Sequence, residues 1–313
     1  MAKKLLLETT APFQGLPELV AYTEGLFAAE GLEIEWIERG QNAPTTAHAS
    51  ITTTQGLSPF MSHASSFETG KAGMYNACEW GNYRRVQDSK VGGRQMGRRA
   101  IIAYAAIVVP PDSPVYTPQQ LANKVVGVPY FAGTHYLCHL MLEGFLPRDL
   151  IKTCQAPYGS GARFRSMMNH EIDATTLTEP YITVAEKAGC RAIVSAFFHG
   201  TEVATDTVDA ETYAAFSRAV KEAVRRINAD KRKYMRYFID YHKSDPLVAV
   251  LTVDDLNTSR LQVEDPAPIP EDELQRTYQW MLSWNMLDRS FGAEGLVDTQ
   301  RQREAHQLIT SDG

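Results

Sequence analysis

The chain has 313 residues, of which 44% are hydrophobic, and this is enough to bury one or two substantial cores. Its formal net charge of -6 at pH 7 excludes a generally basic surface for nucleic acid, and the basic runs at 92–99 and 231–238 are interpreted as solvated faces. No stretch reaches the ~18 consecutive apolar residues of a membrane span, so no transmembrane segment is expected.

Targeting and cofactor signals are weak. The start "MAKKLLLETTAPF" lacks the apolar region of a signal peptide, so the chain as written is expected to be cytoplasmic, and periplasmic or lipid-anchored if a leader precedes it. The cysteines have no CxxC spacing and no clustering with histidine, which predicts reduced, buried thiols and no metal: Cys78, Cys138, Cys154 and Cys190. Neither GxGxxG nor a phosphate loop occurs, so no cofactor is expected.

The first part of the chain predicts a β-α-β start. "KKLLLETT" is typical of a strand, and apolar residues at helical spacing predict a helix over 15–30. Leu32, Ile34 and Trp36 alternate with polar residues and predict the next strand. A helix over 58–69 and a strand over 73–77 follow.

The middle of the chain repeats this alternation. An apolar strand over 100–109 ends at a Pro-Pro pair, and Thr117-Pro118 is typical of a helix start. Further strands and helices are predicted in "KVVGVPY", from Gly133, and in "GARFRSMMN", "IDATTLT", "PYITVAEKAG" and "RAIVSAFF". After about residue 207 the pattern is helical. The alternation predicts an α/β fold with mostly parallel sheets in two lobes.

Two glutamates follow predicted strands, Glu79 in "NACEWGNY" and Glu179 in "EIDATTLTEPY". Ligands collect outside the carboxyl ends of strands, so two facing sheets would direct both carboxylates into one cleft. A ligand amine or protonated ring nitrogen would then pair with them. The alternative is that each glutamate satisfies backbone N–H groups at a helix start, to which Pro180 is well suited.

A second candidate site is "YFAGTHYL". Gly133 allows a tight turn, and Thr134 begins a helix whose free N–H groups suit a carboxylate, sulfonate or nitro group. His135 in the first turn either hydrogen-bonds a ligand, acts as a general acid or base, or has a structural role.

A third candidate is "PYGSGARFR", where glycines can cradle an anion that Arg163 clamps, unless this arginine faces water. Phe13 and Gln14 occupy the first strand-to-helix turn and are expected ligand contacts. Aromatic residues near the strand ends are expected to form walls for a flat ligand, with some of them in the core: Trp80, Tyr130, Phe131, Tyr158 and Tyr181.

Three passages carry a family resemblance: "GLPELVAYTEGLFAAEGLEIEW", "TPQQLANKVVGVPYFAGTHY" and "GARFRSMMNHEIDATTLTEPYITVAEKAG". Together they resemble the type II periplasmic-binding-protein superfamily, in its branch for nitrate, sulfonate, taurine and pyrimidine precursors, over about residues 4–240. The resemblance implies two lobes with a hinge, an interlobe cleft and a helical C-terminal region. It places lobe one at 1–106 plus 196–313 and lobe two at 107–195.

The resemblance implies a solute-binding protein of an ABC transporter, with a small aromatic or zwitterionic organic ligand and a permease as partner if the chain is exported. A homo-oligomer is left open. The alternative is a cytoplasmic enzyme on the same scaffold, a lyase, decarboxylase or hydrolase that uses Glu79 or His135 for proton transfer.

Two enzyme groups of this superfamily can be compared with the chain by residue. The cofactor lysine of the pyrimidine-precursor synthases falls on Ala77 and their nearby histidine on Gly81. The loop "TTAPFQG" lacks the nucleophilic cysteine of the aryl-sulfinate desulfinases. Neither specific chemistry is therefore expected. A ligand-sensing regulatory module ranks behind both readings, since no DNA-binding segment is attached.

Overall fold

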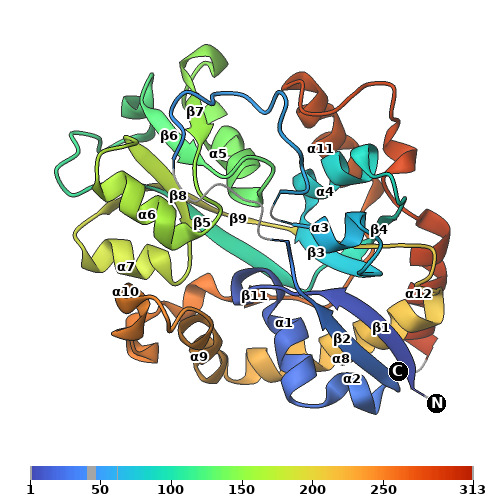
Figure 1. The fold of residues 1–313 in the computed structure, drawn as a ribbon. Coiled ribbons are helices and arrows are strands. Elements are labelled where there is room, and N and C mark those ends of the chain that lie inside the picture. Colours follow the sequence, from blue (N-terminus) through green and yellow to red (C-terminus); the bar gives the residue numbers. More distant parts are fainter. Residues whose placement is uncertain (1, 41–46, 62, 312–313) are drawn as a thin grey trace.

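Two β-sheets organise the chain in a computed structural model that describes residues 2–40, 47–61 and 63–311 (Figure 1). In the first sheet β1 lies in parallel between β2 and β3, and β10 runs antiparallel to both β3 and β4. Its strands in spatial order are β2 (Leu32–Ile37), β1 (Lys3–Glu8), β3 (Met74–Cys78), β10 (Gly200–Ala204) and β4 (Arg94–Arg98).

The second sheet is built around the long apolar strand β5, which pairs antiparallel with β8, β9 and β11. The strand β6 lies in parallel between β8 and β7. The strands are β11 (Gln262–Val263), β5 (Ile101–Val109), β8 (Ala174–Thr178), β6 (Val125–Val128) and β7 (Lys152–Gln155), with β9 (Arg191–Phe198) also paired to β5.

The chain passes between the sheets at Arg99–Ala100 and again at His199, because β4 and β10 belong to the first sheet while β5 and β9 belong to the second. The lobe boundaries expected after residues 106 and 195 fall inside β5 and β9. The C-terminal region, expected wholly in lobe one, also contributes β11 to the second sheet. Below, lobe one and lobe two denote the first and second sheets with the helices that pack on them.

Helices cover both sheets (Figure 1). The long helix α8 packs on α1, α2 and α12, with Leu16, Phe27 and Phe216 fully buried at this contact region. The α-helices are α1 (Pro12–Thr23), α2 (Leu26–Ala29), α3 (Ser65–Glu68), α4 (Glu79–Asp88), α5 (Gly133–Glu143), α6 (Ser160–Met168), α7 (Tyr181–Lys187), α8 (Ala210–Ala229), α9 (Lys231–Tyr241), α10 (Pro246–Ala249), α11 (Glu271–Ser283) and α12 (Thr299–Ser311). Short 3-10 turns occur at Pro118–Leu121, Arg148–Leu150, Val253–Asp255, Thr258–Arg260 and Ala293–Gly295.

The two-lobe α/β prediction is confirmed, but two predicted helices are much shorter than expected. The helix predicted over 58–69 is reduced to α3, because the carboxylate of Glu8 accepts the backbone N–H groups of Ala64 (2.7 Å) and Ser66 (3.2 Å) and delays the helix start. The helix predicted from Pro118 is a single 3-10 turn, which Thr117 and Gln120 close with a capping box.

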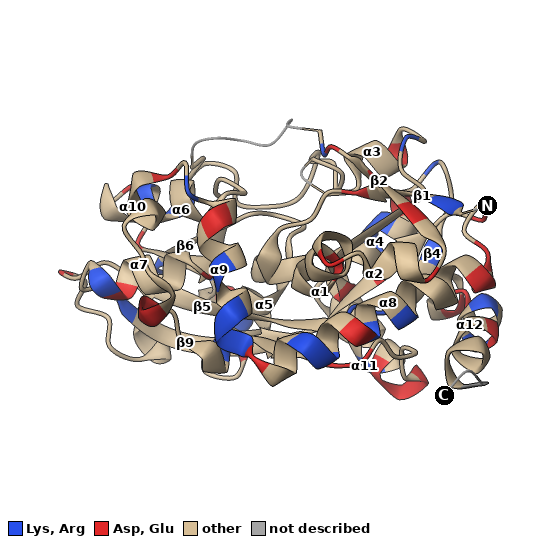
Figure 2. Cartoon of the chain, turned by 90° about the horizontal axis from the view of Figure 1, so that it is seen from below, with Lys and Arg blue, Asp and Glu red and all other residues tan. Residues whose placement is uncertain are grey.

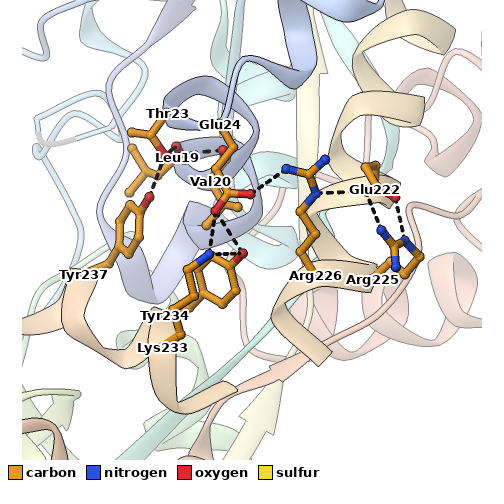
Figure 3. Close-up of polar contacts among 10 residues, drawn as sticks. All are labelled: Leu19, Val20, Thr23, Glu24, Glu222, Arg225, Arg226, Lys233, Tyr234 and Tyr237. Carbon is orange, nitrogen blue, oxygen red and sulfur yellow. Dashed lines mark hydrogen bonds and ion pairs between the residues drawn. The ribbon is translucent and has the colours of Figure 1, made fainter. Parts of the chain in front are cut away.

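Glu24, directly after α1, fastens α9 to lobe one (Figure 3). Its carboxylate accepts hydrogen bonds from Arg226 Nη1 (2.7 Å), Lys233 Nζ (3.1 Å) and the hydroxyl of Tyr234 (2.9 Å). Tyr237, one turn further along α9, contacts the hydroxyl of Thr23. Several cations lie along α9 (Figure 2). Three of them meet carboxylates at close range, as expected for a solvated face: Arg232, Lys233 and Arg236.

Two connections join this region and the C-terminal helices to lobe two. Asp245, just after α9, accepts hydrogen bonds from Arg165 Nη2 (2.6 Å) and the hydroxyl of Tyr181 (2.8 Å). At the end of α11, the indole N–H groups of Trp280 (2.5 Å) and of Trp284, directly after the helix (2.8 Å), donate to the carboxylate of Glu143 on α5. Among the described residues, no helix is both long and apolar enough to cross a membrane.

We expect Glu24→Gln to lower Tm at pH 7 by about 2 °C, because three donors lose a charged acceptor. Hydrogen bonds, above all from Arg226, hold the pKa of Glu24 below its usual range. Its contribution to stability is therefore present above the ordinary glutamate pKa and is lost as the pH falls through the lower, folded-state pKa. Thermal unfolding from pH 3 to pH 7 should show the Tm difference shrinking at acid pH. The exposed Glu33→Gln serves as control, and an equal effect there would contradict this role.

Candidate functional site

A cavity of about 260 Å³ lies between the two lobes, and we call it the interlobe cavity. Lobe one contributes the start of α1, and lobe two contributes the starts of α5 and α6 and the end of β8. The described residues that line it are Ala11, Phe13, Gln14, Arg39, His63, Pro129, Ala132, Gly133, Thr134, Tyr158, Gly159, Ser160, Arg163, Thr178, Phe198, Tyr241 and His242. None of these described residues is an aspartate or glutamate.

Three helix N-termini meet at the cavity. Each helix follows the carboxyl end of a strand: α1 follows β1, α5 follows β6 and α6 follows β7. The N-cap residues of the three helices, Ala11, Ala132 and Gly159, make no side-chain capping hydrogen bond, whereas Asp209 and Asp230 cap α8 and α9. At α5 and α6, uncapped first-turn N–H groups and the positive end of the helix dipole favour an anion. The start of α1 offers less, because Pro12 has no N–H, the Gln14 N–H donates to the carbonyl oxygen of Ala11, and the helix is kinked at Gly15.

Arg163 of α6 supplies a full positive charge beside these helix ends. Its side chain is 2% exposed, and its Nε donates to the carbonyl oxygen of Thr176 (3.0 Å). Its Nη1 donates to the carbonyl oxygens of Pro157 (2.7 Å) and Tyr158 (2.6 Å), and its Nη2 donates to the Ser160 hydroxyl (3.0 Å). These partners are neutral, and burial lowers the pKa of Arg163 to about 9, so the charge remains uncompensated at neutral pH.

Arg39 and His63 line the cavity from lobe one. Arg39 Nη1 donates to Gln14 Oε1 (3.4 Å), and its Nε lies 3.5 Å from Glu8 Oε1 without a hydrogen bond among the described residues. His63 is 8% exposed, and its Nδ1 has no hydrogen-bond partner in the described part of the chain. Burial, and then the charges of Arg39 and two further arginines, lower the pKa of His63 well below its usual range.

Aromatic rings complete the walls. Phe13 and Tyr158 come from the two lobes, and Phe198 stands at the end of β9, just before the passage at His199. Tyr241 and His242, at the end of α9, close another side. Burial lowers the pKa of His242 to about 4, so this imidazole is neutral at pH 7. A flat or apolar ligand body fits between such rings.

The structure brings some of the residues expected from sequence to the cavity and leaves others outside it. Those that line the cavity are Phe13, Gln14, Gly133, Thr134, Tyr158 and Arg163. Those that do not are Glu79, Trp80, His135, Glu179 and Tyr181.

Glu79 does not line the interlobe cavity. The passage at His199 covers the end of β3, where the Glu79 N–H donates to the carbonyl oxygen of His199 (3.4 Å). The carboxylate instead accepts the hydroxyl of Thr277 on α11 (3.4 Å), and burial raises its pKa. Trp80 beside it is packed against Tyr136, Phe198 and Trp280 in the core.

Glu179 has the local role that Pro180 suggested. Thr178, the last residue of β8, lines the cavity, and Glu179, directly after the strand, does not. Its carboxylate accepts the N–H (3.2 Å) and hydroxyl (3.0 Å) of Thr183 in α7 and lies 2.7 Å from Arg260 Nη1. The two glutamates are thus not gathered at one cleft, and neither lies where it would meet a ligand in this cavity.

His135 and Tyr181 are buried in lobe two. The Nδ1 of His135 accepts the N–H of Phe131 (3.3 Å), and burial lowers its pKa well below the usual range. The Tyr181 hydroxyl is engaged by Asp245.

The residues missed by sequence reasoning had different signals. Arg39 lies two residues after the end of β2, so the rule that functional residues follow strand ends would have included it. His63 lies in the connection from β2 to β3, and Tyr241 and His242 lie in a helical tail, where no local pattern indicates a cavity.

Solved structures with the same fold support this architecture. The alkanesulfonate-binding protein SsuA from Xanthomonas axonopodis pv. citri, bound to MOPS, matches with a TM-score of 0.72 at 12% identity over 95% of this chain and 99% of that one. The periplasmic aliphatic sulphonate binding protein SsuA from Escherichia coli matches with a TM-score of 0.65 at 12% identity, over 95% of this chain and 91% of that one. The fold is therefore that of the periplasmic binding proteins.

An enzyme shares the fold as well. The desulfurization enzyme DSZB matches with a TM-score of 0.58 at 14% identity over 97% of this chain and 99% of that one. No protein-family model matches the chain, and no curated protein sequence matches it. The fold alone does not decide between binding and catalysis.

We expect Glu79→Gln to raise Tm at pH 7 by about 2 °C and to leave anion binding unchanged. Burial raises the Glu79 pKa, so the ionised carboxylate is disfavoured in the folded chain, and stability is lost as the pH rises above the ordinary glutamate pKa. Thermal unfolding at pH 5 and pH 8 and calorimetry with benzenesulfonate measure the two effects. A tenfold loss of benzenesulfonate affinity would show that Glu79 takes part in the binding site.

Proposed function

We propose that the protein is a solute-binding receptor of an ABC-type importer and that its ligand is a small organic anion held in the interlobe cavity. The observation that carries the proposal is the buried, uncompensated guanidinium of Arg163 in a cavity whose described lining has no carboxylate. A ligand carboxylate or sulfonate would supply the missing negative charge. The relatives named above with sulfonate ligands fit this class.

The receptor role follows from the way the lining is divided. Arg163 and the starts of α5 and α6 belong to lobe two, whereas Phe13, Gln14 and Arg39 belong to lobe one. A ligand that contacts both sets stabilises only the arrangement in which the lobes are close, and the passages at Arg99–Ala100 and His199 provide a hinge. On the outer side of the membrane, a permease would then distinguish the closed, ligand-bound receptor from the open, empty one.

The geometry favours binding over the expected enzyme. Glu79 and His135, the residues expected to transfer a proton, do not line the cavity. The geometry also favours an anionic ligand group over the cationic group expected from sequence. The reason is that the charged side chains among the described lining residues are arginines.

The proposal is tested by incubating the full chain with a panel of organic carboxylates, sulfonates, amines and neutral amides. Thermal shift identifies the compounds that bind, and mass spectrometry of the recovered compound shows whether it has changed. Stabilisation by anions with unchanged recovery is the expected result. Preferential stabilisation by amines, or conversion to a product, would overturn it.

We expect Arg163→Met to weaken the binding of the best anion at least 30-fold, because a charge-assisted contact is removed from a buried site. Arg163 also holds the carbonyl oxygens of Pro157 and Tyr158, so Tm is measured alongside affinity. Arg163→Lys keeps the charge and should retain more affinity than Arg163→Met. Equal affinities for the two variants, both folded, would show that the charge does not bind the ligand.

Anion affinity should rise as the pH falls from 8 to 5. His63 is neutral in the free protein because burial lowers its pKa. A bound anion would raise the pKa of His63, so that this imidazole takes up a proton on binding. Calorimetry in buffers of different ionisation enthalpy measures the proton uptake. His63→Gln should remove most of it, whereas uptake that persists in this variant would assign the effect to another group.

A further inference from the structure

The interlobe cavity has a second cationic end, which one anionic group on Arg163 does not satisfy. This end lies in lobe one and consists of the charged Arg39, the imidazole of His63, which is neutral in the free protein, and the start of α1. It is made of different chain segments from the end formed by Arg163, α5 and α6.

Among the described residues, Glu8 is the carboxylate within ion-pair distance of Arg39, and it is already engaged. Its two oxygens accept the N–H groups of Ala64 (2.7 Å) and Ser66 (3.2 Å). Its separation of 3.5 Å from Arg39 Nε exceeds the roughly 2.8 Å of a charge-assisted hydrogen bond. The Nε of Arg39 and the Nδ1 of His63 are both buried and without a hydrogen-bond partner among the described residues.

The cavity also has room for more than a single small group. Its volume is about 260 Å³, whereas a single water occupies roughly 30 Å³. Phe13 and Phe198 line the same space, so the part of a ligand that spans it meets apolar surface. A ligand that matches this lining has two polar ends and an apolar middle.

We propose that the ligand is a small dianion, in which one carboxylate or sulfonate binds at Arg163 in lobe two and a second binds at Arg39 and His63 in lobe one, with a short apolar spacer between them. This inference rests on the proposed function and narrows it from anions to dianions. The dianion contacts both lobes through charged groups, so closure depends on the two ends together.

The test compares matched ligands by calorimetry on the full chain. Terephthalate and 4-sulfobenzoate are compared with benzoate and benzenesulfonate, and adipate is compared with hexanoate to vary the spacer. In whichever series, aromatic or aliphatic, has the spacer that fits the cavity better, each dianion should bind at least tenfold more tightly than the matching monoanion. Arg39→Gln should weaken dianion binding at least tenfold and monoanion binding less than threefold.

The control is Arg236→Gln, which removes the same charge from the exposed face of α9 and should change neither affinity by more than twofold. Monoanions that bind as tightly as the dianions in both series, through Arg163, would overturn this inference and leave the proposed function intact. Equal weakening of both ligand classes by Arg39→Gln would also overturn it. Absence of binding by every anion would overturn both proposals.

Discussion

Burying a guanidinium costs several kcal/mol of solvation free energy unless hydrogen bonds and an opposite charge replace the water. The chain meets the first requirement for Arg163 through three carbonyl oxygens and a hydroxyl, and it provides no carboxylate for the second. The same side chain shapes the turn at Pro157 and Tyr158 that forms part of the cavity wall. Charge and wall geometry therefore depend on one residue, and a bound anion would complete an arrangement that the protein has already organised.

The connections between the lobes determine how such a site can close. Glu24 holds the start of α9 on lobe one, whereas Asp245 beyond its end is held by lobe two. Between them, the end of α9 places Tyr241 and His242 in the cavity wall. A second connection runs from α11 to Glu143 of α5. Lobe movement must therefore carry α9 with it, and the aromatic wall would respond to the distance between the lobes.

The fold was predictable from sequence, and the site only in part. Alternating strands and helices indicate two α/β lobes because the period of burial differs between the two kinds of element. Gly133, Thr134 and Arg163 were found because a helix that follows a strand presents its N-terminus at the sheet edge. The same rule misplaced Glu79 and Glu179, since it locates the backbone and not the direction of a side chain. For Glu79 the direction depends on the return of the chain at His199, about 120 residues later.

The sign of charge at the cavity also depends on contacts distant in sequence. In lobe one, burial raises the pKa of Glu18 on α1 to about 7 and that of Glu202 on β10 to about 8. Burial therefore shifts both carboxyl groups toward the protonated, neutral form. Arg39 and Arg99, whose charges act on Glu18, then face less negative charge than the composition suggests. The acidic residues that indicated a cationic ligand, Glu79 and Glu179, do not line the cavity, whereas Arg39 and Arg163 do, and for this reason the assembled site favours an anionic ligand.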